Sequence, residues 1–147
     1  MERSVGWKPL RVLIVDDNPV HRLLLQEIAA DLGACVHLAR DGHEAVEFGE
    51  LITFDLILMD LAMRGMSGEQ TTQVLRFLGV QCPIIAVSAD LQRHYRNELP
   101  RYGFDGLIEK PFVMKTIAST LEAARAFAEK RREGLSVKPL RFGVSDN

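Results

Sequence analysis

The chain has 147 residues, of which 47% are hydrophobic and 26% charged, with a formal net charge of −2. These values fit one globular domain with a sizeable core, and they exclude a disordered chain or one that coats nucleic acid by charge alone. Apolar runs are far shorter than the roughly 20 residues that a membrane-spanning helix needs, and the first nine residues lack the apolar stretch of a signal peptide. We expect a cytoplasmic protein.

Short aliphatic runs alternate with longer segments of helical spacing, which predicts strands that alternate with helices. The runs are apolar throughout, as in parallel strands that are covered on both faces. This pattern indicates an α/β fold with a doubly wound parallel sheet. The five predicted strands are Leu10 to Val15, Cys35 to Ala39, Leu56 to Met59, Ile84 to Ser88, and Gly106 to Ile108.

The first helix is predicted to begin after Asn18 and Pro19 and to stop at Gly33. Its predicted inner stripe comprises Val20, Leu23, Leu24, Ile28 and Leu32. A second helix is predicted to begin after Asp41 and Gly42 and to carry Ala45, Val46 and Phe48.

The third predicted helix follows Ser67 and Gly68 and buries Val74, Leu75 and Leu78. A polar helix with several arginines is expected from Leu91 to about Leu99. The last helix runs from Phe112 to about Arg131, and its predicted inward residues are Ile117, Leu121, Ala124 and Phe127.

We divide the chain into an extension (1–9), one domain (10–130) and a tail (131–147). From Lys130 to Asn147 there are five basic and two acidic residues, but the segment is too short for a DNA-binding module, so we expect no direct DNA binding. The two cysteines, Cys35 and Cys82, are far apart beside strand-like segments, which favours two buried free thiols over a disulfide or a metal site.

Polar residues stand where the predicted strands end. Asp16 and Asp17 follow the first strand, Asp60 the third, Ser88 closes the fourth, and Lys110 follows the fifth. Right-handed crossovers bring the carboxyl ends of parallel strands to one edge of the sheet, where α/β proteins bind ligands. Three carboxylates at this edge would repel one another, and a divalent cation such as Mg²⁺ with its preference for oxygen ligands would neutralise them.

This arrangement favours phosphate chemistry. A carboxylate can act as nucleophile toward a phosphoryl group, as in aspartyl-phosphate enzymes. The ammonium group of Lys110 and the hydroxyl of Ser88 would then hold the transferred oxygens.

Four motifs occur in order: VLIVDDN (12–18), ILMDLAMRGMSG (57–68), IIAVSAD (84–90) and EKPF (109–112). Together they resemble the receiver domain of bacterial response regulators, the CheY-like domain of two-component and phosphorelay systems. The resemblance covers about Leu10 to Phe127. It implies a flavodoxin-like sheet with strand order 2-1-3-4-5.

The resemblance also implies a role for each site residue. Asp60 would accept a phosphoryl group, and Asp17, Asp60 and the backbone carbonyl of Ala62 would bind Mg²⁺ directly. Asp16 would act largely through a water. Ser88 and Lys110 would contact the phosphoryl oxygens, while Ala62 and Asp90 occupy positions that tune the lifetime of the phosphoryl group. The protein would be a phosphoprotein with chemistry limited to its own phosphorylation and dephosphorylation, rather than an enzyme.

The implied partners are a sensor histidine kinase or histidine phosphotransfer protein as donor, and a downstream protein. The downstream protein would bind the face made by the helix after Ser88, the fifth strand and the last helix, and a homodimer is an open possibility. Two residues depart from the family pattern. Arg64 stands where proline is common, and Leu107 stands where an aromatic residue often swings inward on activation.

Alternative interpretations stay open. The chain could be a receiver-shaped interaction module that works without phosphorylation, or the receiver portion of a hybrid histidine kinase. A haloacid-dehalogenase-type phosphatase is disfavoured because that family has Asp-x-Asp after its first strand. The histidines His21, His37 and His94 are expected to have surface or packing roles. The arginines Arg93, Arg96 and Arg101 with Tyr95 suit a solvated face better than a nucleotide site.

Overall fold

All five predicted strands are present and form one parallel sheet. The computed structural model describes residues 8–89 and 96–134. The order of the strands is β2-β1-β3-β4-β5, and every neighbouring pair is parallel. This confirms the predicted doubly wound sheet and its order 2-1-3-4-5. The strands are β1 (Arg11–Val15), β2 (Cys35–Ala39), β3 (Leu56–Asp60), β4 (Ile84–Ser88) and β5 (Gly106–Glu109).

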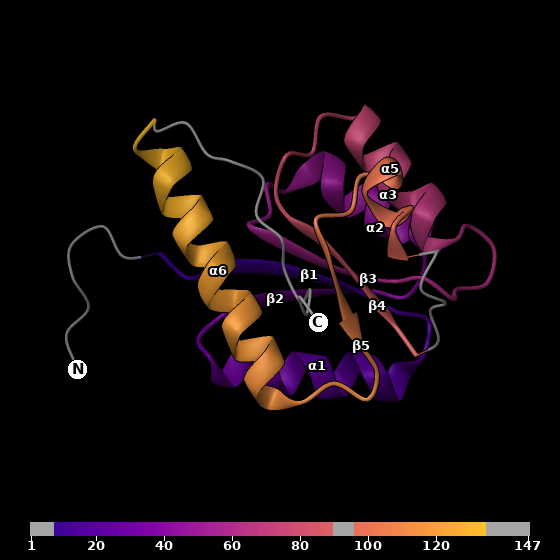
Figure 1. Cartoon of the computed structure of the whole chain (residues 1–147), viewed down its shortest axis with the longest axis horizontal. Coiled ribbons are helices and arrows are strands. Elements are labelled where there is room, and N and C mark those ends of the chain that lie inside the picture. Colours follow the sequence, from indigo (N-terminus) through magenta and orange to yellow (C-terminus); the bar gives the residue numbers. More distant parts are fainter. Residues whose placement is uncertain (1–7, 90–95, 135–147) are drawn as a thin grey trace.

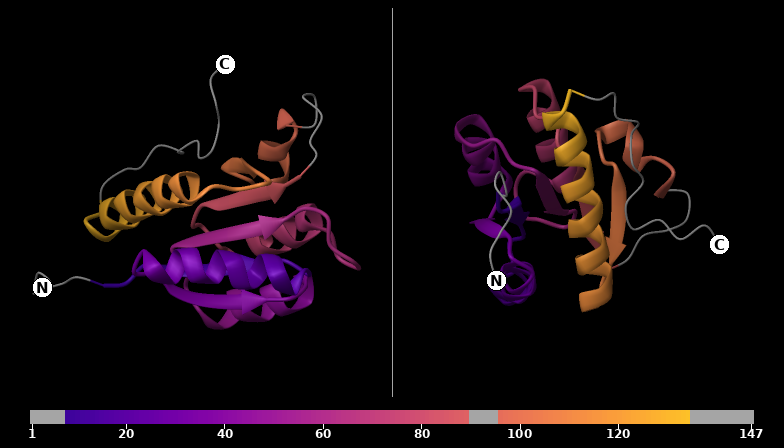
Figure 2. Two further views of the ribbon diagram at one scale, coloured as in Figure 1. Left: turned by 90° about the horizontal axis from the view of Figure 1, so that it is seen from below. Right: turned by 90° about the vertical axis from the view of Figure 1, so that its left-hand side faces the viewer.

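Helices cover both faces of the sheet. Two of them, α1 and α6, lie on one face, and α2, α3 and α5 lie on the other (Figure 1); the side views in Figure 2 show the sheet between these layers. The helix predicted from Leu91 to about Leu99 falls largely outside the described residues. The described helices are α1 (Pro19–Asp31), α2 (Gly42–Leu51), α3 (Gly68–Phe77), α5 (Leu99–Tyr102) and α6 (Met114–Arg132).

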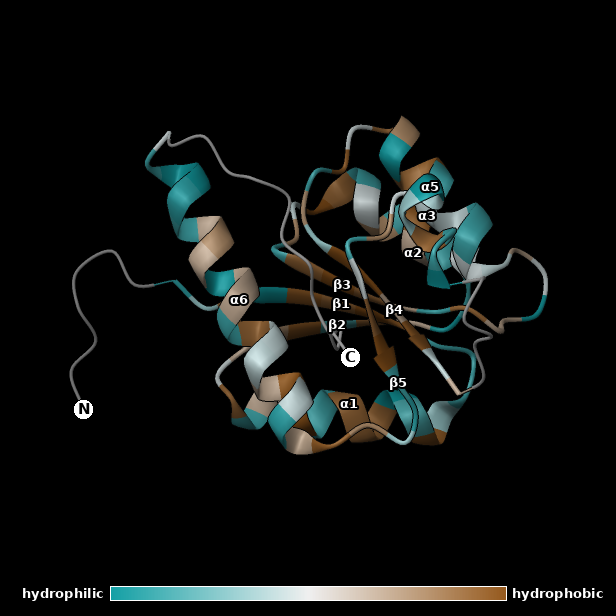
Figure 3. Ribbon diagram, viewed as in Figure 1, coloured by the Kyte–Doolittle hydropathy of each residue, from teal (hydrophilic) through white to brown (hydrophobic). Residues whose placement is uncertain are grey.

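Alternate residues of each strand feed two separate hydrophobic cores, because successive side chains point to opposite faces. On β1, Leu13 and Val15 join the core under α2 and α3, while Val12 and Ile14 join the core under α1 and α6. Figure 3 shows the apolar strands between partly polar helices. Strands buried on both faces explain why the runs in the sequence are continuously apolar.

The inner face of α1 differs from the predicted stripe. Leu25 and Ala29 are fully buried against the sheet, whereas Val20, Leu23, Leu24 and Leu32 are exposed. The helix is apolar on more than one side, so its spacing is compatible with two different inner faces. The face with the small Ala29 is the one that packs on the sheet, with Ile28 beside it.

Three further expectations need correction, and several hold. Leu78 is exposed, because α3 has already ended at Phe77. Of the two cysteines, Cys35 is exposed at the start of the edge strand β2 and Cys82 is buried, and both are free thiols. Phe127 is only partly buried, and Ala128 is buried instead. The buried residues Ile117, Leu121 and Ala124 of α6 are as predicted. No helix among the described residues combines the length and apolarity that a membrane crossing requires.

Candidate functional site

The predicted acidic residues meet at the carboxyl edge of the sheet. Asp16 and Asp17 follow β1, and Asp60 is the last residue of β3, which pairs with β1. One carboxylate oxygen from each of these residues lies within 4.8 Å of the others. Three carboxylates from two adjacent strand ends therefore form one cluster.

Asp16 is the most firmly held member of the cluster. Its side chain is buried, and its Oδ1 accepts a hydrogen bond of 2.9 Å from the backbone N–H of Asn18. The Asp16 carbonyl accepts a 2.7 Å hydrogen bond from Nη1 of Arg22. Asn18 caps α1 by accepting from the N–H groups of Val20 and His21, so the turn that orients Asp16 is the same turn that begins the helix.

Asp60 is 4% exposed and lies under the loop that leads into α3. Its Oδ1 accepts a hydrogen bond of 3.4 Å from the N–H of Ala62. Gly68, the first residue of α3, packs so closely that a Cβ there would lie 2.2 Å from the Asp60 carbonyl oxygen. The start of α3 thus closes over the end of β3, which only a glycine permits.

Burial raises the pKa of Asp60 to about 6, and the neighbouring carboxylate of Asp16 adds to this rise, while the ammonium group of Lys110 opposes it. Desolvation and a like charge both disfavour the ionised carboxyl. The ionised form of Asp60 is therefore disfavoured in the folded protein, and a cation bound at the cluster would stabilise it.

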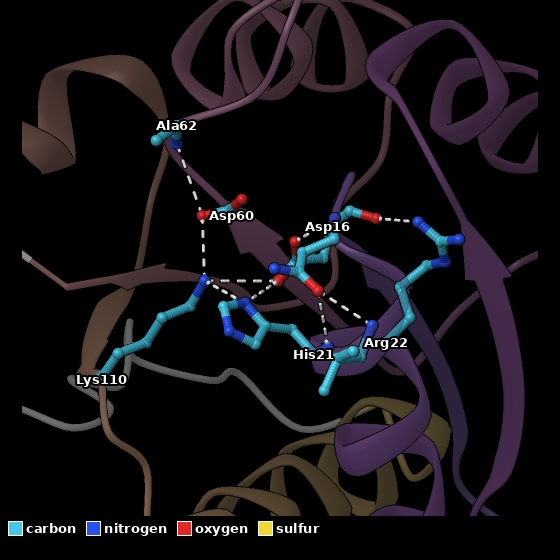
Figure 4. Close-up of polar contacts among 8 residues, drawn as sticks. Asp16, His21, Arg22, Asp60, Ala62 and Lys110 are labelled. Carbon is cyan, nitrogen blue, oxygen red and sulfur yellow. Dashed lines mark hydrogen bonds and ion pairs between the residues drawn. The ribbon is translucent and has the colours of Figure 1, made fainter.

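Lys110 follows β5 and reaches across the sheet edge toward the acidic cluster (Figure 4). Its Nζ lies 3.5 Å from Oδ1 of Asp60 and 3.4 Å from Oδ2 of Asp16. Its backbone N–H donates a 2.8 Å hydrogen bond to the carbonyl of Ser88, and the peptide bond to Pro111 is cis. One lysine therefore contacts carboxylates at the carboxyl ends of two different strands.

Ser88 is buried at the end of β4, the strand between β3 and β5. It is in register with Glu109, the residue before Lys110, and its neighbour Val87 is in register with Asp60. The predicted placement of Ser88 at the same edge as Asp60 and Lys110 is correct.

His21 belongs to this site, which corrects the surface or packing role that the sequence analysis expected for it. Its Nδ1 lies 3.0 Å from Nζ of Lys110 and 3.5 Å from Oδ2 of Asp16. An ammonium group only donates, so the shorter contact makes Nδ1 an acceptor and leaves the ring proton on Nε2. His21 lies in the first turn of α1, a helix that begins at the cluster, and this position is the signal that could have identified it.

The remaining residues named in the sequence analysis lie partly at the site, partly in packed positions and partly at the surface. The N–H of Arg64 donates to Oδ2 of Asp17 at 3.2 Å, and its side chain is exposed. Leu107 is buried in the core under α3. His37 packs edge-on against Phe48 and Phe54, which confirms the packing role expected of it.

Of the arginines expected on a solvated face, Arg96 pairs with Glu109 and Arg101 is exposed. The residues Asp90, Arg93, His94 and Tyr95 lie outside the described residues.

The donor set fits Mg²⁺. All the clustered ligand atoms are carboxylate oxygens, which are the ligands this hard cation prefers, and it usually keeps several waters. Ala62, whose carbonyl was predicted as a further ligand, follows Asp60 by two residues and is exposed at the same edge. A cation at this point would offset the charges that raise the pKa of Asp60.

Comparisons with known proteins agree with this geometry. The model of the response regulator receiver domain matches residues 12–122. Sensor histidine kinase GacS of Pseudomonas protegens is 33% identical over 125 residues, which are 82% of this chain but only 14% of GacS.

Two solved structures have the same fold. Chemotaxis protein CheY4 of Vibrio cholerae is 28% identical, with a TM-score of 0.76 over 80% of this chain and 99% of CheY4. The receiver domain of sensor histidine kinase PA1611 from Pseudomonas aeruginosa is also 28% identical, with a TM-score of 0.75 over 81% of this chain and 99% of that domain. The PA1611 domain was solved with a magnesium ion in its active-site cleft. With its sheet order and acidic edge, this chain belongs to the response regulator receiver domain family.

Proposed function

We propose that this chain is a Mg²⁺-dependent phosphoacceptor that takes a phosphoryl group from a phosphohistidine onto Asp60. The observation that carries the proposal is the position of the Asp60 carboxylate. It is buried, it lies within 4.8 Å of carboxylate oxygens of Asp16 and Asp17, and its Oδ1 is 3.5 Å from the ammonium group of Lys110, which also contacts Asp16. A nucleophile, an acidic cation site and a counter-charge for phosphoryl oxygens thus meet at one sheet edge.

The transfer needs Asp60 in its ionised form. With a pKa of about 6, most of the carboxyl is ionised at pH 7. A carboxylate oxygen attacks the phosphorus atom, a phosphorus–oxygen bond forms, and the phosphorus–nitrogen bond to the donor breaks. The electron pair of the broken bond returns to the imidazole nitrogen, which then takes a proton.

Each surrounding residue supports one part of this step. Lys110 would turn from the carboxylate of Asp60 to the oxygens of the transferred group, to which the hydroxyl of Ser88 would also donate. Asp16, Asp17, Asp60 and the carbonyl of Ala62 would hold Mg²⁺, which neutralises the charge on the phosphoryl oxygens. Beyond its own phosphorylation and dephosphorylation, we propose no enzymatic activity for this chain.

A histidine-bearing donor would approach past the first turns of α1 and α6, where several apolar side chains are exposed. Val20 and Leu23 of α1 are 68% and 58% exposed, and Val113 and Met114 at the start of α6 are 57% and 59% exposed. Val20 precedes His21, and Val113 follows Lys110 by three residues. We propose that the kinase or phosphotransfer protein covers these residues, since exposed apolar patches commonly mark such contacts.

The output surface we propose includes β5, α6 and the segment for which the sequence predicts a helix from Leu91 to about Leu99. In the described part, Glu109 of β5 pairs with Arg96, so a change near Ser88 and Lys110 would reach this face directly. A downstream protein, or a second copy of the chain, would bind there after phosphorylation. We place the protein in the cytoplasm, and since it matches 14% of GacS, the receiver portion of a hybrid kinase is the alternative to a stand-alone regulator.

The test is phosphorylation by acetyl phosphate with Mg²⁺, followed by intact-protein mass spectrometry. We expect one added phosphoryl group on the wild type, none on Asp60→Asn, and none when EDTA removes the metal. Asp31→Asn, an exposed carboxyl at the end of α1, is the matched control and should react normally. Labelling that survives in Asp60→Asn would refute the assignment of the nucleophile.

The alternative of a module that works without phosphorylation is tested in the same samples. If wild type and Asp60→Asn bind the same protein with equal affinity before and after acetyl phosphate treatment, binding does not depend on the modification. A phosphorylation-dependent regulator requires the treated wild type to bind more tightly or more weakly than Asp60→Asn.

A further inference from the structure

The backbone N–H of Arg64 makes a contact that the residue more common at this position could not make. Arg64 lies in the loop between β3 and α3, and its N–H donates a 3.2 Å hydrogen bond to Oδ2 of Asp17 after β1. Receivers commonly carry proline here, and proline has no backbone N–H to donate. The departure from the family pattern therefore changes the surroundings of a site carboxylate.

The loop is built so that this N–H faces the site. The N–H groups of Met63 and Gly68 both donate to the carbonyl of Leu61, at 3.2 and 3.3 Å. Gly65 then takes a positive φ of 73°, which turns the chain away directly after Arg64. Arg64 thus stands at a turn whose base is anchored beside Asp60, and its side chain is exposed to solvent.

The Asp17 carboxylate depends on a hydrogen-bond partner for its orientation, because it is the least buried of the three carboxylates in the cluster. Asp16 is fixed by the N–H of Asn18 and Asp60 by burial and the N–H of Ala62. Among the described residues, the backbone N–H of Arg64 is the hydrogen-bond donor to the Asp17 carboxylate. With Oδ2 occupied by this donor, Oδ1 stays available to a cation, and the carboxylate is held in one orientation.

We propose that the Arg64 amide is a positioning group that orients Asp17 for Mg²⁺ and ties the loop between β3 and α3 to the end of β1. The inference rests on the proposed function, because it assigns Asp17 to the metal. Partners that orient a ligating carboxylate typically change metal affinity by 10–100-fold when they are removed. The guanidinium group has no part in this role.

Two substitutions separate the amide from the side chain. Arg64→Ala keeps the N–H and removes the guanidinium, whereas Arg64→Pro removes both. We expect Arg64→Ala to bind Mg²⁺ as the wild type does, by titration followed with NMR or calorimetry, and Arg64→Pro to bind about tenfold more weakly. Equal affinity in wild type and Arg64→Pro would overturn the proposal, as would an equal loss in Arg64→Ala.

A direct measurement on the amide covers the case in which Arg64→Pro perturbs the fold. In metal-free protein, hydrogen exchange at the residue 64 amide is expected to be slow in the wild type and in Arg64→Ala. It should become at least several-fold faster in Asp17→Ala, which lacks the acceptor, and stay slow in Asp31→Asn. Fast exchange in the wild type, or no change in Asp17→Ala, would contradict the hydrogen bond itself.

These outcomes separate this proposal from the proposed function. If the wild type binds no Mg²⁺ and takes no phosphoryl group, the proposed function fails, and the proposal that rests on it falls as well. If the wild type does both and Arg64→Pro matches it in Mg²⁺ affinity, the positioning role alone is wrong.

Discussion

Nδ1 of His21 accepts a hydrogen bond from Nζ of Lys110 over 3.0 Å, which ties the first turn of α1 to the residue after β5. Lys110 thereby has three partners in the described structure, His21 and the carboxylates of Asp16 and Asp60. In the proposed phosphorylation, these contacts would hold the lysine beside Asp60 before the phosphoryl group arrives, so that only the end of its side chain would have to move.

Removing this acceptor should slow the transfer. In His21→Ala, Lys110 loses a hydrogen bond worth about 1 kcal/mol, and we expect phosphorylation by acetyl phosphate to slow about fivefold while Mg²⁺ affinity changes little. The rate of phosphoprotein formation, followed by mass spectrometry, measures this. His43→Ala, an exposed histidine of α2, is the control, and equal rates in the two variants would contradict the role of His21.

Replacing Lys110 should move the pKa of Asp60 upward. Burial and Asp16 raise the pKa of Asp60, whereas the ammonium group of Lys110 and the N–H of Ala62 lower it. In Lys110→Met the ammonium group is lost, and of the two groups that favour the ionised carboxyl only the N–H of Ala62 is left. We expect the pKa of Asp60 to exceed its wild-type value of about 6 in metal-free protein. A carbon-13 NMR titration of the Asp60 carboxyl gives the value, and a lower pKa in Lys110→Met would show that the lysine does not act through its charge.

The same pKa makes stability depend on pH. The pKa of Asp60 is about 6 in the folded state, against 3.8 for an aspartate in the unfolded chain. The folded state therefore binds more protons between these values, and this contribution to the free energy of unfolding falls as pH rises through the window. Asp60→Asn removes the carboxylate whose ionised form is disfavoured in the folded state. At pH 7 in EDTA, the free energy of unfolding of this variant should therefore exceed that of the wild type by up to about 3 kcal/mol.

Urea denaturation at pH 7 and pH 4 checks this expectation. The advantage of Asp60→Asn over the wild type should shrink at pH 4, where the wild-type carboxyl is largely protonated in the folded state. Asp31→Asn should show no such dependence. An advantage that is as large at pH 4 as at pH 7 would mean that repulsion at Asp60 is not its source.

Gly68→Ala should damage both the fold and the site. The added Cβ would lie 2.2 Å from the Asp60 carbonyl oxygen and 2.9 Å from Cα of Leu61, which are backbone atoms that cannot turn aside. Either α3 or the end of β3 has to shift, with a loss of roughly 2–4 kcal/mol in the free energy of unfolding. Denaturant unfolding measures the loss, and Gln73→Ala on the exposed side of α3 should be nearly neutral.

Arg76 is expected to contribute to the free energy of unfolding by an amount similar to that of Gly68. Its guanidinium donates to the carbonyls of Val80, Cys82 and Gly103 and to the carboxylate of Asp105, and thereby connects α3 with the segments that flank β4 and β5. Arg76→Ala leaves these acceptors without their donor and leaves Asp105, whose pKa is already raised by burial, without its counter-charge. We expect a loss of about 2–4 kcal/mol in urea denaturation, whereas Arg101→Ala, an exposed arginine, should change little.

The sheet and the acidic site could be predicted because both depend on short-range patterns. Strands covered on both faces give continuous apolar runs, and the residue after each run must lie at the carboxyl edge. Asp16, Asp60, Ser88 and Lys110 were therefore placed correctly. The strand order came from the family resemblance, since nothing in the spacing of the runs orders them across a sheet.

What could not be predicted depends on which of two faces packs, or on contacts distant in sequence. The helix α1 is apolar on two sides, and spacing alone does not favour the side with Leu25 and Ala29 over the side with Val20 and Leu24. The contacts of His21 with Lys110 and of Arg64 with Asp17 join residues 89 and 47 positions apart. Such contacts follow from the folded loops, which single-sequence patterns do not describe.

The groups of the proposed phosphoacceptor site are far apart in the sequence. They come from the ends of β1, β3, β4 and β5, and they meet only when those strands have paired in order. An incomplete or cleaved chain that lacks one of these strands cannot assemble the nucleophile, its cation site and Lys110 together. If the proposed function is correct, labelling of Asp60 by a small phosphodonor would therefore report that β1, β3, β4 and β5 have paired, and the modification would serve as an assay of native structure during refolding.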